Sequence, residues 1–299
     1  MKLYNDFIDW YETFRMPFIQ EVTTYKYKRT AEIIKEKFGD IPTSEINRKA
    51  LQKFFNELSQ KYQKLTIKIH NDQMHAFFQS LVDDGELERN PMNNINFSGV
   101  EKEKKKKYLD VEEYEVLKES LDLTDKTELM LYVAMQTGMR YAEVLGITPA
   151  DIYDKKGIKF ININKTMDYK VNKGEFKTTK TKSSIREIAI DATLFDALYV
   201  WIVDKKIREN EGIFGLNFAS VTNKKLMQIC TTLDISIISF HGLRHTHGSI
   251  LLRHGVPMLS VSKRLGHASM SITQDIYIHL TKEQEEEDNL EIINILGGV

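Results

Sequence analysis

The first 97 residues carry apolar side chains at helical spacing, interrupted by residues that end helices. Four amphipathic faces follow one another, centred on residues 7–14, 25–38, 51–58 and 67–82. Gly39 and the Asn90-Pro91 pair stand where two of these helices should end. The pattern predicts a small all-α domain of four or five short helices.

The pattern changes after residue 157, where β-structure is expected. Residues 158–164 and 176–190 are rich in β-branched and aromatic side chains, with a break at Ser183 and Ser184. We expect a three-stranded antiparallel sheet with a hairpin turn near Ser183. Helical spacing returns over 191–235, so the second part of the chain is predicted to mix helices with a small sheet.

Glycine, proline and capping residues predict further short helices in this part. Asp110 and Glu113 have the spacing of an N-terminal capping pair, and an apolar helix should stop at Gly138. Three helices are expected near the C-terminal end, at about 242–254, from Pro257 to Gly266, and from about 269 onward through residue 277. Residues 290–296 predict a last apolar helix or strand.

A charged run without apolar side chains separates the two parts. Residues 101–107 read EKEKKKK. We therefore predict a helical domain over 1–97, a basic linker over 98–107, and a mixed domain with a C-terminal tail over 108–299. The run is typical of a flexible tether, and it would also suit a strap along a phosphate backbone.

The formal net charge of −1 hides an uneven distribution. Residues 151–280 hold 19 Lys and Arg against 12 Asp and Glu, whereas 281–299 hold one Lys and six acidic residues. A basic body with an acidic tail favours a nucleic-acid partner in spite of the neutral total. Basic residues also lie among aromatic or apolar helix positions and in the linker, where they are candidate DNA contacts or simply solvated: Lys26, Lys28, Arg29, Lys64, Lys68, Lys104, Lys105 and Lys106.

Composition also restricts the compartment. The sequence has no run of about 18 apolar residues and no secretory signal, so neither a membrane span nor export is expected. Its only cysteine is Cys230, which excludes a disulfide framework or a cysteine-based zinc site within one chain. These features predict a cytoplasmic protein.

Six residues suggest chemistry on a phosphate: Arg140, Lys180, His241, Arg244, His267 and Tyr277. Arginine and histidine donate to phosphate oxygens, and lysine is readily tuned to release a proton. Tyrosine offers a phenolic oxygen that can attack phosphorus without a metal or another cofactor. His241 and Arg244 share one helical face because they are three residues apart.

Simpler interpretations exist for several of these residues. Arg140 with Glu143 is, by itself, typical of a surface ion pair, and an isolated Tyr277 is typical of an amphipathic helix. His241, His245 and His247 have spacing that permits a metal site, but the arginine between them repels a cation. We therefore expect no metal, and structural roles for His245 and His247.

The chain resembles the tyrosine recombinases, which are the phage- and transposon-type integrases. The motifs that carry the resemblance are TGMRYAE (137–143), KTKSSIR (180–186), HGLR (241–244) and LGH (265–267), followed ten residues later by Tyr277. Their order and spacing fit the family over about residues 1–285. The resemblance implies a mainly α fold with a small antiparallel sheet, in which a helical, SAM-like core-binding domain precedes a mixed α+β catalytic domain.

The resemblance implies a site-specific recombinase that cleaves and rejoins DNA through a 3′-phosphotyrosine, integrating or excising a mobile element. Tyr277 would be the nucleophile, and Arg140 and Arg244 would clamp the scissile phosphate. Lys180, favoured over the neighbouring Lys182, would be the general acid for the leaving 5′-oxygen. His241 would assist proton transfer, and His267 would bind the phosphate. The remaining DNA contacts in this region would be Lys182 and Arg186.

The implied partners are double-stranded attachment or core sites, three further copies of the chain, and accessory DNA-bending or directionality proteins. The implied reaction needs neither metal nor ATP, and the implied location is the bacterial cytoplasm, on the nucleoid. A resolvase of chromosome or plasmid dimers, a non-catalytic DNA-binding regulator and a metal-dependent nuclease are the alternatives. Many integrases begin with an arm-binding domain, so the chain is either a member without that domain or a truncated one, and we expect truncation.

Overall fold

A computed structural model describes residues 2–19, 21–101, 106–171, 173–179, 184–267, 269–270, 274 and 296. The chain divides into two compact units, Met1–Lys104 and Lys105–Val299. Within the described residues, no helix is both long and apolar enough to span a membrane.

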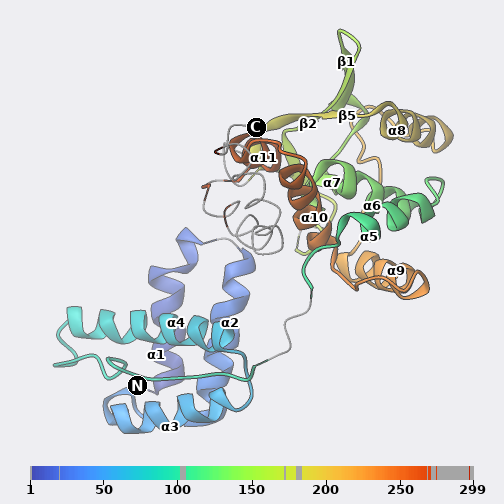
Figure 1. Cartoon of the computed structure of the whole chain (residues 1–299). Helices are drawn as coiled ribbons and strands as arrows, with labels where there is room; N and C mark the ends of the chain where they lie inside the picture. Colours follow the sequence, from blue (N-terminus) through green and yellow to red (C-terminus); the bar gives the residue numbers. More distant parts are fainter. Residues whose placement is uncertain are drawn as a thin grey trace. The chain divides into compact units, whose positions relative to one another are not determined.

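The first unit is helical, as the periodicity predicts. It contains α1 (Leu3–Phe14), α2 (Glu21–Phe38), α3 (Arg48–Ser59) and α4 (Lys64–Asp83), with short 3-10 turns at Met16–Phe18 and Thr43–Glu45 (Figure 1). Gly39 has a φ of 53° directly after α2, so it ends that helix as predicted. The predicted end of α4 at Asn90 is wrong, because the chain already turns through Gly85 at a φ of 78°.

Part of the predicted linker lies on the first unit. The Ser98 N–H donates to Ser59 Oγ at 3.3 Å, and the Val100 N–H donates to the Tyr62 carbonyl at 2.9 Å. Between them, Gly99 passes so close to α4 that a Cβ there would lie 2.2 Å from the Lys64 nitrogen. Residues 98–100 are therefore packed.

The second unit is built around a buried apolar helix. Its helices are α5 (Val111–Ser120), α6 (Lys126–Thr137), α7 (Tyr141–Leu145), α8 (Ala192–Asp204), α9 (Ala219–Thr232), α10 (Phe240–Arg253) and α11 (Met258–Leu265), with a 3-10 turn at Pro149–Asp151. Residues 129–135 of α6 are each at most 4% exposed. A helix that is apolar on all sides must be covered on all sides, so the other elements pack around α6.

Two small antiparallel sheets accompany these helices. The first has the order β1-β2-β5, formed by β1 (Ile152–Lys155), β2 (Ile158–Ile163) and β5 (Arg186–Ile190). The second pairs β3 (Lys165–Met167) with β4 (Phe176–Thr178). Figure 1 shows α8 following directly on β5.

The structure has a three-stranded sheet, but not the predicted one: it includes β1, which the residue pattern missed, and the predicted hairpin over 176–190 is wrong. The strands on the two sides of Ser183 belong to different sheets. Burial explains the choice, since Ile161 of β2 pairs with Ile188 of β5 and both are buried, whereas β4 is exposed along its length. Apolar cross-strand pairing thus decides which strands meet.

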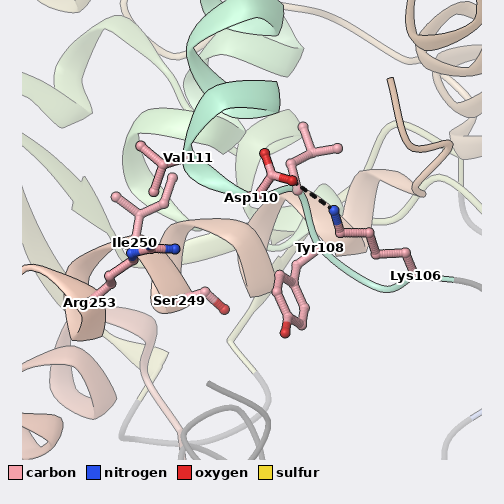
Figure 2. A pocket seen from close by; sticks show the side chains of 8 residues that line it. Lys106, Tyr108, Asp110, Val111, Ser249, Ile250 and Arg253 are labelled. Carbon is pink, nitrogen blue, oxygen red and sulfur yellow. Dashed lines mark hydrogen bonds and ion pairs between the residues drawn. The ribbon is translucent and has the colours of Figure 1, made fainter. Parts of the chain in front are cut away.

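The residues that follow the predicted linker pack on helix α10 (Figure 2). The Leu109 N–H donates to Thr246 Oγ1 at 2.9 Å, and the same hydroxyl donates to the Gly242 carbonyl at 3.0 Å. The predicted capping pair of α5 is confirmed, and Lys106 pairs with both of its carboxylates. A cavity of about 290 Å³ adjoins this contact and is lined by Lys106, Tyr108, Leu109, Asp110, Val111, Ser249, Ile250 and Arg253.

Candidate functional site

Three helices converge at Gly138, and this convergence positions the site. Gly138 ends α6 with a φ of 66°. A Cβ there would lie 2.6 Å from Leu265 Cδ2 and 2.8 Å from His247 Cδ2, so only glycine lets α10 and α11 come this close. Two residues later, Arg140 is the N-cap of α7.

Arg140 is held by a buried carboxylate. Its Nη1 donates to Glu143 Oε1 at 2.7 Å, and its backbone N–H donates to Glu143 Oε2 at 2.9 Å. The side chain of Glu143 is 2% exposed, whereas that of Arg140 is 39% exposed. The interpretation as a surface ion pair is therefore wrong: the carboxylate is internal, and it presents a partly open guanidinium.

Arg244 lies in the N-terminal half of α10 and is 2% exposed. Its Nη1 donates to the Gly138 carbonyl at 2.8 Å and its Nη2 to the Leu265 carbonyl at 2.6 Å. Burial, together with the charge of Arg140, lowers the pKa of Arg244 to about 9. A lowered pKa means that the positive charge is under-compensated, which favours an incoming anion.

The C-terminal turn of α11 holds three arginines. The carbonyls of residues 264, 265 and 266 accept from Arg186, Arg244 and Arg140, respectively. These carbonyls belong to the end of a helix, where intrahelical partners are missing and the partial charge is negative. Gly266 closes the turn with a φ of 67°. The turn therefore fixes both phosphate-binding candidates at once.

Two further histidines lie around the arginines. Burial and the charges of Arg244 and Arg140 lower the pKa of His267 to about 4. The surrounding protein and the same two arginines lower the pKa of His241, although its side chain remains open to solvent. Both rings are therefore neutral near pH 7, when each can donate one N–H and accept at the other nitrogen.

His247 has a structural role, as expected. Its Nδ1 donates to the Met135 carbonyl at 2.8 Å, and its Nε2 accepts from Arg264 Nε at 3.0 Å. Burial and the charge of Arg264 lower its pKa to about 3. Arg264 also donates to the carbonyls of Ala189 and Gln136, so it joins β5, α6 and α10.

His245 does not take part in the contacts between His247 and Arg264. Its ring meets that of His241 edge to face, with the ring centroids 4.8 Å apart. Burial and the charge of His241 lower the pKa of His245 to about 4. Across the described residues, no group of three His, Cys, Asp or Glu side chains is placed to hold a metal ion.

The structure brings together four of the six candidate catalytic residues: Arg140, His241, Arg244 and His267. The other two, Lys180 and Tyr277, lie outside the described residues, as do Lys182, Lys104 and Lys105. The expected third helix and the last apolar segment also fall there, apart from isolated positions. The described four form an electropositive site that can bind a tetrahedral oxyanion.

The candidate DNA contacts differ in their surroundings. Lys26 and Lys28 on α2 and Lys64 on α4 are exposed. Arg29 pairs with Glu32, and Lys68 pairs with Asp72, in exposed ion pairs that cost little to break. Lys106 pairs with Asp110 and Glu113.

Arg186 has a setting that its candidate role did not anticipate. Its side chain is 7% exposed, and it donates to Glu143 and to the carbonyls of Ser184 and Arg264. This geometry favours a role inside the unit over a contact with DNA. Sequence reasoning also missed Arg264 and the carbonyl acceptors of α11, because backbone acceptors leave no mark in a residue pattern.

Comparisons with known proteins agree with this geometry. The family model described as "Phage integrase family" matches residues 103–284. A "Tyrosine recombinase XerC-like" protein of Caldanaerobacter subterraneus subsp. tengcongensis is 29% identical over 265 residues, which cover 79% of this chain and 68% of that protein. The "ICEBs1 integrase" of Bacillus subtilis is 28% identical over 237 residues, or 73% of this chain and 63% of the relative.

Solved structures share the fold. The Tn1549 transposon integrase (residues 82–397), solved in complex with circular intermediate DNA, aligns with a TM-score of 0.75 at 16% identity. The alignment covers 98% of this chain and all of that one. This likeness confirms the mainly helical fold with small antiparallel sheets.

Proposed function

The chain belongs to the phage integrase family, the tyrosine recombinases, which cleave and rejoin DNA, and we propose that it integrates or excises a mobile element through a 3′-phosphotyrosine. Its relatives include the "ICEBs1 integrase" of Bacillus subtilis and an integrase of Staphylococcus phage L54a, and the Tn1549 transposon integrase shares its fold. These names favour a mobile element over the resolution of chromosome dimers, although XerC proteins are also among the relatives.

The observation that carries the proposal is the joint anchoring of Arg140 and Arg244. The two guanidiniums come from sequence positions about 100 residues apart and donate to neighbouring carbonyls of α11. A pentavalent phosphorus centre gains negative charge on its non-bridging oxygens, which two fixed cations stabilise. His267 is neutral in the same place and supplies a further donor.

The chemical step assigned to Tyr277 is an in-line displacement. Its phenolic oxygen forms a bond to phosphorus while the bond from phosphorus to the 5′-oxygen breaks. Lys180 gives a proton to the leaving 5′-oxygen, and His241 assists removal of the phenolic proton. Attack by another 5′-hydroxyl reverses these steps and rejoins the strand, so the reaction consumes neither ATP nor a metal ion.

The proposed partner is duplex DNA at an attachment or core site. Lys26, Lys28 and Lys64 would contact its backbone from the first unit, and Lys104 to Lys106 and Lys182 would contact it elsewhere. Four copies of the chain would act on two sites, helped by accessory DNA-bending or directionality proteins. The bacterial and phage origin of the relatives supports the bacterial cytoplasm as the place of action.

Trapping of covalent protein–DNA adducts tests the proposal. The chain is incubated with sheared DNA from its source genome, denatured in SDS and recovered, and the attached DNA is sequenced. We expect one enriched site with the wild-type chain in the presence of EDTA, and no adduct with Tyr277→Phe. Enrichment without any adduct would favour a regulator, and free DNA ends that EDTA abolishes would favour a metal-dependent nuclease.

A further inference from the structure

Arg186 is a buried cation that the proposed chemistry does not use. It opens β5, and its side chain is 7% exposed. Its Nη2 donates to Glu143 Oε2 at 3.0 Å, its Nη1 to the Ser184 carbonyl at 2.9 Å, and its Nε to the Arg264 carbonyl at 2.6 Å. Every nitrogen of the guanidinium therefore has a protein partner, so its interactions are internal.

The partner that matters is Glu143, which is shared by two arginines. Arg140 donates to Oε1 at 2.7 Å, and Arg186 donates to Oε2 at 3.0 Å and to Oε1 at 3.3 Å. A lone carboxylate facing one arginine would form a two-pronged ion pair and would cancel its charge. Here, burial raises the pKa of Glu143, but the hydrogen bond and charge of Arg186, together with Arg140, lower it overall. The carboxylate is thus ionised.

We propose that Arg186 is a positioning residue that neutralises Glu143, so that the charge of Arg140 remains available to the scissile phosphate. The inference rests on the proposed function, in which Arg140 binds that phosphate. Without Arg186, the Oε2 atom of Glu143 loses its side-chain partner and draws the guanidinium of Arg140 into a closed pair. Glu143 then neutralises the charge of Arg140, and the guanidinium of Arg140 faces away from the phosphate.

A second set of contacts, with the end of α11, links Arg186 to the same site. Its Nε binds the carbonyl of Arg264, and the next two carbonyls along α11 bind Arg244 and Arg140. Arg186 therefore fixes the turn on which both phosphate-binding arginines are anchored. Both effects of Arg186 act on the geometry around the phosphate. A substitution of Arg186 should therefore reduce the cleavage rate more than the affinity for DNA.

The test measures single-turnover cleavage of the site found by adduct sequencing, together with DNA affinity. For Arg186→Met we expect cleavage to fall about 100-fold, the loss that misplacement by about 1 Å can produce, with affinity changed less than threefold. Arg186→Lys restores the charge but not the fork, so it should lose about tenfold. Arg208→Met, which removes an 86% exposed arginine from the same unit, should cleave normally.

A double variant separates positioning from folding. Arg186→Met with Glu143→Gln removes both charges, so it should cleave at least tenfold faster than Arg186→Met alone. A substrate with a neutral methylphosphonate at the scissile position should reduce the Arg186→Met penalty by a similar factor. Equal losses in the single and double variants, or on both substrates, would overturn the inference. Absence of wild-type adducts would instead overturn the proposed function, and this inference with it.

Discussion

His247 should make the second unit less stable at acid pH. A single substitution of His247 can isolate this contribution to the pH dependence of stability. The ring is buried and neutral between Met135 and Arg264, with a pKa lowered to about 3 from 6.5 by burial and by Arg264. In the unfolded chain the imidazole binds a proton at about its ordinary pKa. The contribution of His247 is therefore fully present above pH 6.5 and is lost as the pH falls toward 3.

The size of the effect follows from the width of that interval. One extra proton on the unfolded chain changes the free energy of unfolding by about 1.4 kcal/mol per pH unit. From pH 6.5 to about 4.5, His247 should thus remove roughly 3 kcal/mol of stability. For a unit of this size, that lowers the melting temperature by roughly 6–12 °C.

The matched variant is His247→Gln, whose amide can donate to the Met135 carbonyl and accept from Arg264 without titrating. Thermal unfolding from pH 7 to pH 4.5 should show a shallower loss for this variant than for the wild-type chain. His254→Gln, an exposed position directly after the same helix, should follow the wild-type curve. Identical pH dependence in wild type and His247→Gln would refute the buried neutral imidazole.

Two further pairs of substitutions test the packing that positions the site. Thr246→Val leaves the Leu109 N–H without its acceptor, so urea unfolding should show a loss of about 1–3 kcal/mol, whereas Thr246→Ser, which keeps the hydroxyl, should lose less. Gly266→Ala and Gly255→Ala should each cost roughly 1–2 kcal/mol of stability, because both glycines have positive φ. Only Gly266→Ala should also slow cleavage, since its carbonyl anchors Arg140; equal cleavage by the two variants would contradict that anchoring.

Local signals predicted much of the fold. The capping pair at Asp110 and Glu113 and the stops at Gly138 and Gly266 all appear, because caps and left-handed residues act within one turn. Strand pairing was predicted less well. The choice between β4 and β2 as neighbour of β5 depends on which residues face α6 and the core, which is a tertiary property.

The candidate site, like the fold, was predictable where the signal is local and unpredictable where it depends on tertiary packing. Residue type and spacing were enough to select Arg140, His241, Arg244 and His267, since their chemistry lies in the side chains themselves. The burial of Glu143 and the inward orientation of Arg186 were not predictable, because both depend on tertiary contacts that join α7, β5 and the end of α11 through Arg186. Even the acceptors that hold Arg140 and Arg244 are carbonyls, which every sequence position supplies equally.

The most direct measurement identifies the atom that joins protein to DNA. Covalent adducts of the wild-type chain are digested with protease and nuclease, and the peptide that retains a nucleotide is sequenced by mass spectrometry. The account predicts a single modified peptide, with a 3′-nucleotide linked through phosphate to Tyr277. A nucleotide on any other residue, or an adduct that persists in Tyr277→Phe, would contradict it.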